Sequence, residues 1–144
     1  MTIFVIIITS ILSVLYSIQE GVREGMYWHY KSKSGNETMN EHPIFFAQRT
    51  VFFISIAMII FSNLSLLTSF FHLSSLVLVF PYFHGGYMYA IRNGRNDKIY
   101  KKGFKSDPSE TSTAKINFKY KTRLYMFIIA ISLEVIHLII NLSN

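Results

Sequence analysis

The sequence predicts an all-α membrane protein with four transmembrane helices in an antiparallel bundle and both termini on the non-cytoplasmic side. Three observations lead to this prediction. Of the 144 residues, 51% are hydrophobic and only 15% are charged, whereas about a quarter are charged in a typical soluble domain. The apolar residues are concentrated in four long stretches. All 14 Lys and Arg residues lie in or beside the two segments that join the first stretch to the second and the third to the fourth.

The four apolar stretches are expected to cross the hydrocarbon core, which takes about 17–25 helical residues. We place the spans at residues 3–19, 44–62, 65–91 and 124–142, and the cytoplasmic loops at residues 20–43 and 92–123. Together they form one integral membrane domain over residues 1–144. The first stretch is interpreted as a retained span, because no basic residue precedes it and no small-residue cleavage site follows it.

The positions of the basic residues predict the orientation of the chain. Four of them accompany the first loop and ten lie within residues 92–123. Because basic loops remain in the cytoplasm, both segments are expected on that side, and four spans then place the termini and the turn at residues 62–65 outside. The expected location is a bacterial inner membrane or an equivalent membrane, crossed several times.

Local signals predict the boundaries and irregularities of the later helices. Asn40 suits a helix N-cap and Pro43 suits a first helical turn, so the second helix is expected to begin near residue 41. The turn at residues 62–65 is so short that the second and third spans must be antiparallel neighbours. Pro81 lacks an N–H group and predicts a kink in the third span.

Small residues recur every four positions along the first helix, at Ser13, Ser17, Gly21 and Gly25. Such a stripe lets another helix backbone approach closely, and in lipid this packing drives helix association. We expect the stripe to pack within the chain, against the second or the fourth span. Homodimerisation through the same stripe is the alternative.

The fourth span carries two ionisable residues, which are costly inside a bilayer and indicate a functional site. Glu134 and His137 lie one turn apart, at the Glu-x-x-His spacing of di-metal bundles. His72 of the third span is expected at a similar depth and is a weak candidate for a third ligand. Three interpretations stay open: a buried polar pair, a site that handles protons or ions, and a metal or haem site. The sequence identifies no cofactor.

A second group of candidate site residues is expected at the cytoplasmic membrane face: Glu20, Glu24, Arg49, His84 and Arg92. The two arginines suit the phosphate of a lipid headgroup. His84 beside a carboxylate has the chemistry of a general base. The alternative is a structural network of ion pairs.

Several classes of function are excluded or disfavoured. Cysteine is absent, so the chain has no disulfide, thiolate nucleophile or zinc-thiolate site. The patterns GxGxxG, GxxxxGK[ST], GxSxG and HExxH are absent. Residues 92–123 hold ten basic and three acidic residues, a net charge of +7. Beside a membrane this charge favours anionic lipid headgroups as the partner, and not nucleic acid.

The resulting hypothesis is a small, non-enzymatic integral membrane protein whose basic cytoplasmic face contacts anionic lipid headgroups or a partner complex. Two alternatives remain. One is a membrane enzyme or a metal- or haem-binding protein that uses the Glu134/His137 or the Glu20/His84 residues. The other is a pore-forming, holin-like protein or an ion-transporting subunit, for which a homo-oligomer or a larger membrane complex is expected.

Overall fold

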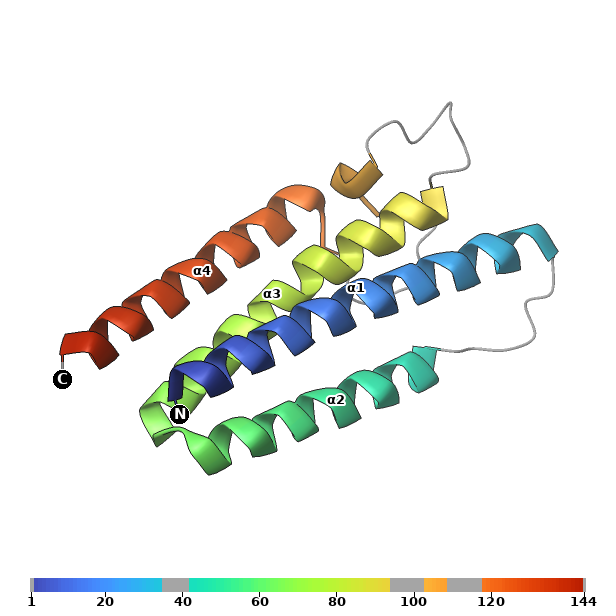
Figure 1. The fold of residues 1–144 in the computed structure, drawn as a ribbon. Coiled ribbons are helices and arrows are strands. Elements are labelled where there is room, and N and C mark those ends of the chain that lie inside the picture. Colours follow the sequence, from blue (N-terminus) through green and yellow to red (C-terminus); the bar gives the residue numbers. More distant parts are fainter. Residues whose placement is uncertain (1, 35–41, 94–102, 109–117, 144) are drawn as a thin grey trace.

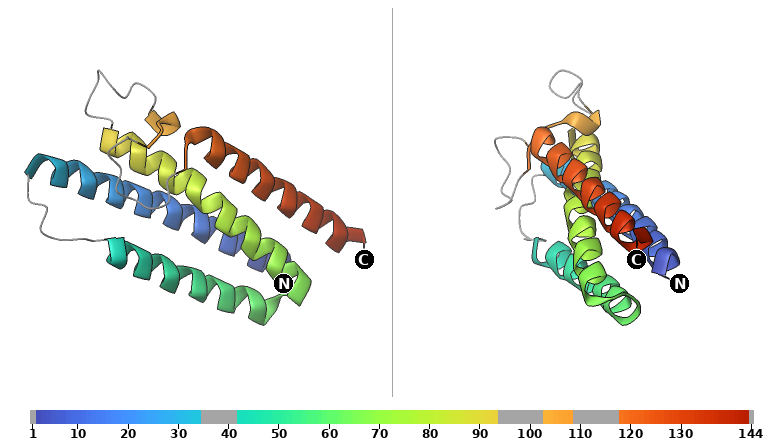
Figure 2. Two further views of the ribbon diagram at one scale, coloured as in Figure 1. Left: turned by 180° about the vertical axis from the view of Figure 1, so that it is seen from behind. Right: turned by 90° about the vertical axis from the view of Figure 1, so that its left-hand side faces the viewer.

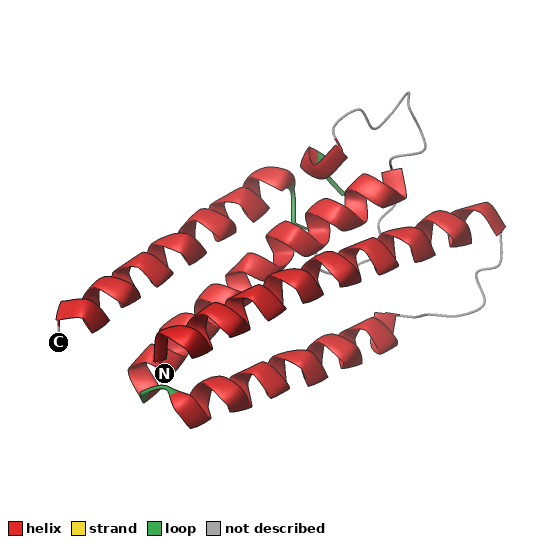
Figure 3. Cartoon of the chain, viewed as in Figure 1, coloured by secondary structure: helices red, strands yellow, loops and turns green. Residues whose placement is uncertain are grey.

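A computed structural model describes residues 2–34, 42–93, 103–108 and 118–143, which are almost entirely helical (Figures 1 and 3). The long helices are α1 (Thr2–Ser34), α2 (His42–Asn63), α3 (Leu66–Asn93) and α4 (Tyr120–Ser143), with a 3-10 turn η1 (Gly103–Lys105) before α4. By length and composition, each long helix holds a stretch able to cross a membrane. These stretches are Thr2–His29, Pro43–Asn63, Leu66–Arg92 and Tyr120–Ile139. The predicted all-α chain with four candidate spans is therefore confirmed.

Two helices extend beyond the predicted spans. α1 continues from residue 19 to Ser34, through much of the first predicted cytoplasmic loop, and its helical course over residues 21–30 is also expected from the sequence. α4 begins at Tyr120, four residues before the predicted start of the fourth span. Hydropathy marks only the apolar part of a helix, and the polar turns at its ends follow local propensity and packing. α3 continues through Pro81 as one helix, and the kink predicted at this residue stays a prediction.

α1 and α3 pack closely against each other and lie side by side in all three ribbon views (Figures 1 and 2). Thr9 bonds to His72, and Gly21 and Gly25 lie against His84 and Met88. Every pair is separated by 63 residues, so α1 and α3 run in the same direction. The orientation of the helices relative to a membrane, and an antiparallel bundle as a whole, remain predictions.

The small-residue stripe of α1 forms this contact. A Cβ atom added to Gly25 would lie 2.7 Å from the carbonyl oxygen of Met88, and one added to Gly21 would overlap the carbonyl of His84. Ser13 and Ser17 are buried along the same helix. The stripe thus packs within the chain, but on α3 and not on the second or fourth span as expected. The α3 backbone therefore covers the small-residue face of α1. So close an approach is possible only where the side chains are small.

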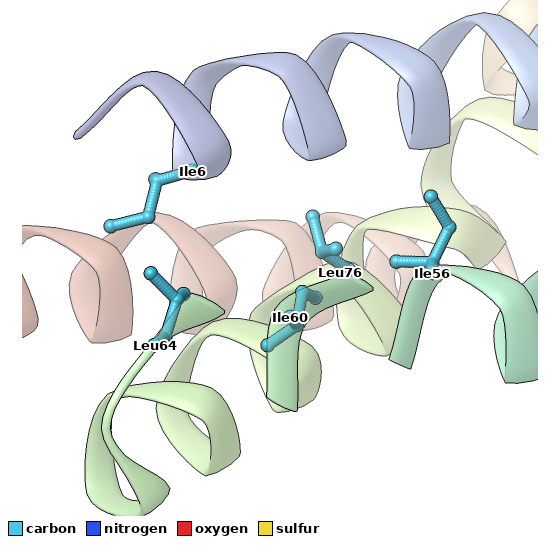
Figure 4. Packing of buried hydrophobic residues seen from close by; sticks show 5 residues of the cluster. All are labelled: Ile6, Ile56, Ile60, Leu64 and Leu76. Atoms are coloured by element: carbon cyan, nitrogen blue, oxygen red, sulfur yellow. The ribbon is translucent and has the colours of Figure 1, made fainter. Parts of the chain in front are cut away.

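The apolar residues are distributed in the reverse of the soluble pattern. A small buried cluster joins α1, α2 and α3 near the turn between α2 and α3, and it consists of Ile6, Ile56, Ile60, Leu64 and Leu76 (Figure 4). Large apolar side chains elsewhere point outward, among them Phe46, Leu66 and Ile139. Extensive exposed apolar surface is rare on soluble monomers and suits a lipid environment.

Small polar side chains are buried in the helix interfaces. They include Thr9, Ser13 and Ser17 of α1 and Ser69 and Ser75 of α3. The Ser75 hydroxyl donates to the carbonyl oxygen of Ala130 over 3.1 Å and so joins α3 to α4. In lipid, such small polar residues hold helices together by close packing and hydrogen bonds. This polar interface positions the ionisable residues.

Candidate functional site

Two buried groups of ionisable side chains lie in the helix interfaces. The basic-end cluster consists of Glu20 and Glu24 of α1, Arg49 of α2 and His84 of α3. The central cluster consists of Thr9 of α1, His72 of α3, and Glu134 and His137 of α4. The sequence predicted every one of these residues except Thr9 as a site candidate.

Arg49 is the hub of the basic-end cluster. Its Nε donates to Glu20 Oε1 over 2.6 Å, and its Nη2 bonds to Glu24 Oε2. The same Nη2 lies 3.0 Å from His84 Nε2. Both carboxylates are buried, whereas the arginine side chain is 28% exposed. The guanidinium thus connects α2 to α1 and α3 through charge-assisted hydrogen bonds, which are stronger than neutral ones.

Further contacts fix Glu24 and His84. His84 Nε2 lies 2.9 Å from Glu24 Oε2, and the imidazole stacks on Phe80 with ring centroids 4.9 Å apart. The indole of Trp28 donates to the other carboxylate oxygen of Glu24 over 3.1 Å. The carboxylate therefore contacts three side chains. With Nε2 held between Arg49 and Glu24, this geometry favours the structural ion-pair network over a general base.

The basic-end cluster also has the composition of a metal site. Ligand atoms of Glu20, Glu24 and His84 all lie within 4.8 Å of one another. Carboxylate and imidazole groups are common ligands of divalent metals. Arg49, however, contacts all three residues. Its positively charged guanidinium, in direct contact with all three candidate ligands, would repel a cation, so the arrangement does not fit a metal ion with Arg49 in place.

Arg49 and Arg92, the pair predicted to bind a phosphate, have different surroundings. Arg49 is engaged by carboxylates, and the Arg92 guanidinium lies 6.0 Å from the centre of the Trp28 ring. A different basic residue is better placed for an anion. Arg23 of α1 bonds to Gln48 Oε1 of α2, and within the described residues it has no carboxylate partner.

A cavity of about 590 Å³ lies between α1 and α2, beside the basic-end cluster. Its lining includes Tyr16, Glu20 and Arg23 of α1 and Gln48, Val51 and Phe52 of α2. Tyr16, Arg23 and Gln48 were not predicted as site residues from the sequence. The sequence does contain a signal for two of them. Tyr16 lies one helical turn before Glu20, on the same helix face, and Gln48 directly precedes Arg49, so both adjoin predicted site residues.

The central cluster joins three helices around a fully buried histidine. His72 has 0% exposure; its Nε2 lies 2.7 Å from Thr9 Oγ1, and its Nδ1 lies 2.5 Å from Glu134 Oε1. His137 Nδ1 lies 3.7 Å from Glu134 Oε2. The structure therefore brings together His72, Glu134 and His137, as the sequence predicted. Thr9 was missed, because its partner lies 63 residues away.

Hydrogen-bond donors and acceptors constrain the protons of the central cluster. Thr9 Oγ1 lies 2.7 Å from the carbonyl oxygen of Val5, which can only accept, so the hydroxyl donates there. The hydroxyl oxygen then accepts from His72 Nε2–H. One further proton must lie between His72 Nδ1 and Glu134, because two lone pairs 2.5 Å apart would repel each other. Whichever residue holds it, the pair carries no net charge.

This constraint disfavours a metal in the central cluster. Both nitrogens of His72 already have polar partners, Thr9 and Glu134. Across the described ranges, His72, Glu134 and His137 do not form a compact group of three ligand atoms, whereas Glu20, Glu24 and His84 do. A neutral pair is also less costly to bury than a lone charge. The cluster fits a polar network in which His72 and Glu134 share one hydrogen-bonding proton.

Arg123 is a buried residue that sequence reasoning assigned only to the basic loop. It is 1% exposed at the start of α4, and its Nη2 donates to the carbonyl oxygen of Ser106 over 2.7 Å. The guanidinium lies 5.4 Å from the Tyr89 ring centre, and its side chain fills the space beside Gly85. Arg123 thereby joins the η1 segment to α3 and α4. Its position directly before the fourth apolar stretch was a sequence signal that Arg123 belongs to a helix end and not to the loop.

No protein-family model matches the chain, and comparisons with curated proteins and with solved structures also find no similar protein. The geometry of the chain itself is therefore the basis for its proposed function.

Proposed function

We propose that the chain is a small, non-enzymatic integral membrane protein whose basic end faces the cytoplasm and contacts anionic lipid headgroups. One observation supports this proposal above others: the described basic residues are collected at one end of the four helices. They are Arg23, Lys31, Lys33, Arg49, Arg92, Lys105, Lys119, Lys121 and Arg123.

The course of the chain explains this distribution. The C-terminal ends of α1 and α3 and the N-terminal ends of α2 and α4 lie at one end of the molecule (Figure 1). Both termini and the turn between α2 and α3 lie at the other end, whose described residues include no Lys or Arg. The positive-inside rule then favours a cytoplasmic basic end and an external location for both termini.

The charge at this end also suggests its lipid partner. A basic residue near an anionic leaflet contributes about 1 kcal/mol of attraction. Lys105, Lys119 and Lys121 are described next to the membrane-spanning helices, and Lys119 and Lys121 are exposed. Several such residues acting together would hold a layer of anionic lipid around this end of the protein.

Cysteine labelling tests the orientation, because the chain has no cysteine of its own. We would introduce single cysteines by Asn36→Cys, Ser109→Cys and Ser65→Cys and label them with a membrane-impermeant maleimide from each side. The proposal requires Asn36→Cys and Ser109→Cys to react from the cytoplasmic side and Ser65→Cys from the opposite side. Reaction of the first two from opposite sides would overturn it.

Lipid exchange tests the anionic contact. We expect the protein to melt at a higher temperature in nanodiscs of phosphatidylglycerol than in nanodiscs of phosphatidylcholine. The double variant Lys119→Gln/Lys121→Gln should reduce this difference, whereas Ser132→Gln, an exposed change on the apolar part of α4, should leave it unchanged. Equal melting temperatures in the two lipids would contradict the proposal.

Proton handling is a second candidate function, favoured by the Thr9–His72–Glu134 chain of hydrogen bonds. An ionisable group inside a membrane segment frequently belongs to a proton relay. We would load liposomes containing the protein with a pH-sensitive dye and impose a potassium diffusion potential. Proton entry that is lost in Glu134→Gln and kept in Ser132→Ala would support this function, and no entry above that of empty liposomes would exclude it.

A further inference from the structure

We propose that the cavity between α1 and α2 binds one molecule of an anionic phospholipid whose headgroup carries a hydroxyl, such as phosphatidylglycerol. The phosphate would lie at Arg23 and an acyl chain along Val51 and Phe52, and the headgroup would fold back so that its hydroxyl reaches Glu20. This inference rests on the proposed membrane orientation and names one specific lipid site within the basic end.

The first support is an uncompensated positive charge at the polar end of the cavity. Arg23 is held by Gln48 Oε1, and its guanidinium lies 5.1 Å from the ring centre of Phe45. Neither partner is charged, and no described carboxylate pairs with Arg23. A phosphate monoanion would supply the missing charge and accept several of the guanidinium N–H groups.

The second support is a pair of buried polar atoms that lack partners. Glu20 is 2% exposed, and its Oε1 accepts from Arg49. Neither its Oε2 nor the hydroxyl of Tyr16 has a partner within full hydrogen-bonding distance among the described residues, although the hydroxyl lies near the Glu20 carboxylate, and both side chains line the cavity. A buried acceptor without a donor is costly. A hydroxyl on the ligand would donate to Oε2, and the Tyr16 hydroxyl would donate to an ester or phosphate oxygen.

The third support is the change from polar to apolar lining along the cavity. Beyond Glu20, the rings of Tyr16 and Phe52 stack with centroids 3.8 Å apart and form part of an apolar wall. Val51 and Ser55 continue the lining along α2, and both are exposed, so the cavity is open to its surroundings. Its volume of about 590 Å³ falls within the roughly 300–1,000 Å³ of small-ligand sites. An amphiphile matches this gradient better than a wholly polar ligand.

Native mass spectrometry can test this site directly. The purified protein would be incubated with equal amounts of phosphatidylglycerol and phosphatidylcholine of identical acyl chains, and the lipid that stays bound in the gas phase would be identified. Val51→Phe and Ser55→Phe place a ring in the cavity. Ile54→Phe is the matched control, because Ile54 is exposed on the same helix and does not line the cavity.

We expect the wild-type chain and Ile54→Phe to retain one phosphatidylglycerol, and the two cavity variants to lose it. Arg23→Gln should lower the preference for phosphatidylglycerol roughly tenfold, as expected when one charge-assisted contact is lost. Lys121→Gln, at the same end but outside the cavity, should not. Retention that is equal in Val51→Phe, Ser55→Phe and Ile54→Phe would overturn the site.

Two other results would also overturn it, and they separate this inference from the proposed function. If phosphatidylglycerol raises the melting temperature but no lipid is lost on filling the cavity, the general contact stands and the specific site does not exist. A dimer that Val51→Phe converts to a monomer, with no lipid bound to either, would show that a second copy occupies the cavity.

Discussion

Arg49 of α2 and Glu20 of α1 are joined by a hydrogen-bonded ion pair of 2.6 Å, and the carboxylate side chain is 1% exposed. Because Arg49 also contacts Glu24 and His84, a single side chain of α2 holds polar groups of both α1 and α3. Several consequences of this arrangement can be measured.

Replacing Arg49 with methionine should strongly destabilise the fold. The change would leave two buried carboxylates without their cation, and removing one partner of a buried ion pair costs about 3–5 kcal/mol. Because the arginine is partly exposed, we expect the lower end of that range. Arg49→Lys should be intermediate, because one ammonium cannot reproduce the guanidinium geometry. Thermal unfolding in detergent would check this, with Lys121→Met as a control that should not change stability.

A divalent cation should replace the missing guanidinium in the same variant. With Arg49→Met, the ligand atoms of Glu20, Glu24 and His84 remain within 4.8 Å of one another, if the fold is kept. Zn²⁺ or Mn²⁺ should then raise the melting temperature of this variant and leave that of the wild type unchanged. The double variant Arg49→Met/His84→Leu serves as the control and should not respond. An equal response of the wild type would mean that the metal and Arg49 bind together.

Enlarging the glycines of α1 should separate α1 from α3. A Cβ at Gly25 would lie 2.7 Å from the Met88 carbonyl oxygen, and one at Gly21 would overlap the His84 carbonyl. Overpacking of this kind costs about 1–3 kcal/mol, offset by roughly 1 kcal/mol from the better helix propensity of alanine. We therefore expect Gly21→Ala to lower the melting temperature and Gly21→Leu to lower it much further. Ser132→Leu, on an exposed face of α4, should have little effect.

In the central cluster, Glu134→Gln should be tolerated better than Glu134→Ala. His72 Nε2 donates to Thr9, so a neutral imidazole presents Nδ1 as an acceptor, and a glutamine amide can donate to it. Alanine would leave this buried nitrogen without a partner, at a cost of about 1–3 kcal/mol. Chemical unfolding of both variants in the same detergent would measure the difference. Identical losses of stability would show that His72 does not need a donor at this position.

The fold was largely predictable from the sequence because a bilayer imposes simple rules on length and hydropathy. Four apolar stretches gave four long helices, and the polar residues Glu20, Glu24, Arg49 and His84 were grouped correctly from their expected depth. The expected depth of a residue in the membrane does not show which helices lie next to each other. The stripe of α1 was expected on its neighbours in an up-and-down bundle, yet it packs on α3.

The pairing within each cluster was less predictable for a related reason. Hydropathy treats Arg49 and Arg92 alike, but Arg49, within α2, contacts two buried carboxylates, whereas Arg92 lies beside the Trp28 ring. Arg123 was counted with the loop cations, although its guanidinium is enclosed by Tyr89, Tyr120 and backbone carbonyls. Such contacts depend on side chains brought together from distant parts of the chain, which periodicity within one segment cannot reveal.

The register of 63 residues between α1 and α3 has a consequence for biosynthesis. When the first helix leaves the ribosome, Arg49 of the second helix, which pairs with Glu20 and Glu24, and the third helix, which covers the small-residue stripe, have not yet been made. The two carboxylates therefore gain their arginine with the second helix, and the small-residue stripe is covered only once the third helix has been made. Truncation after the second helix should leave a nascent chain that quality-control proteases can recognise.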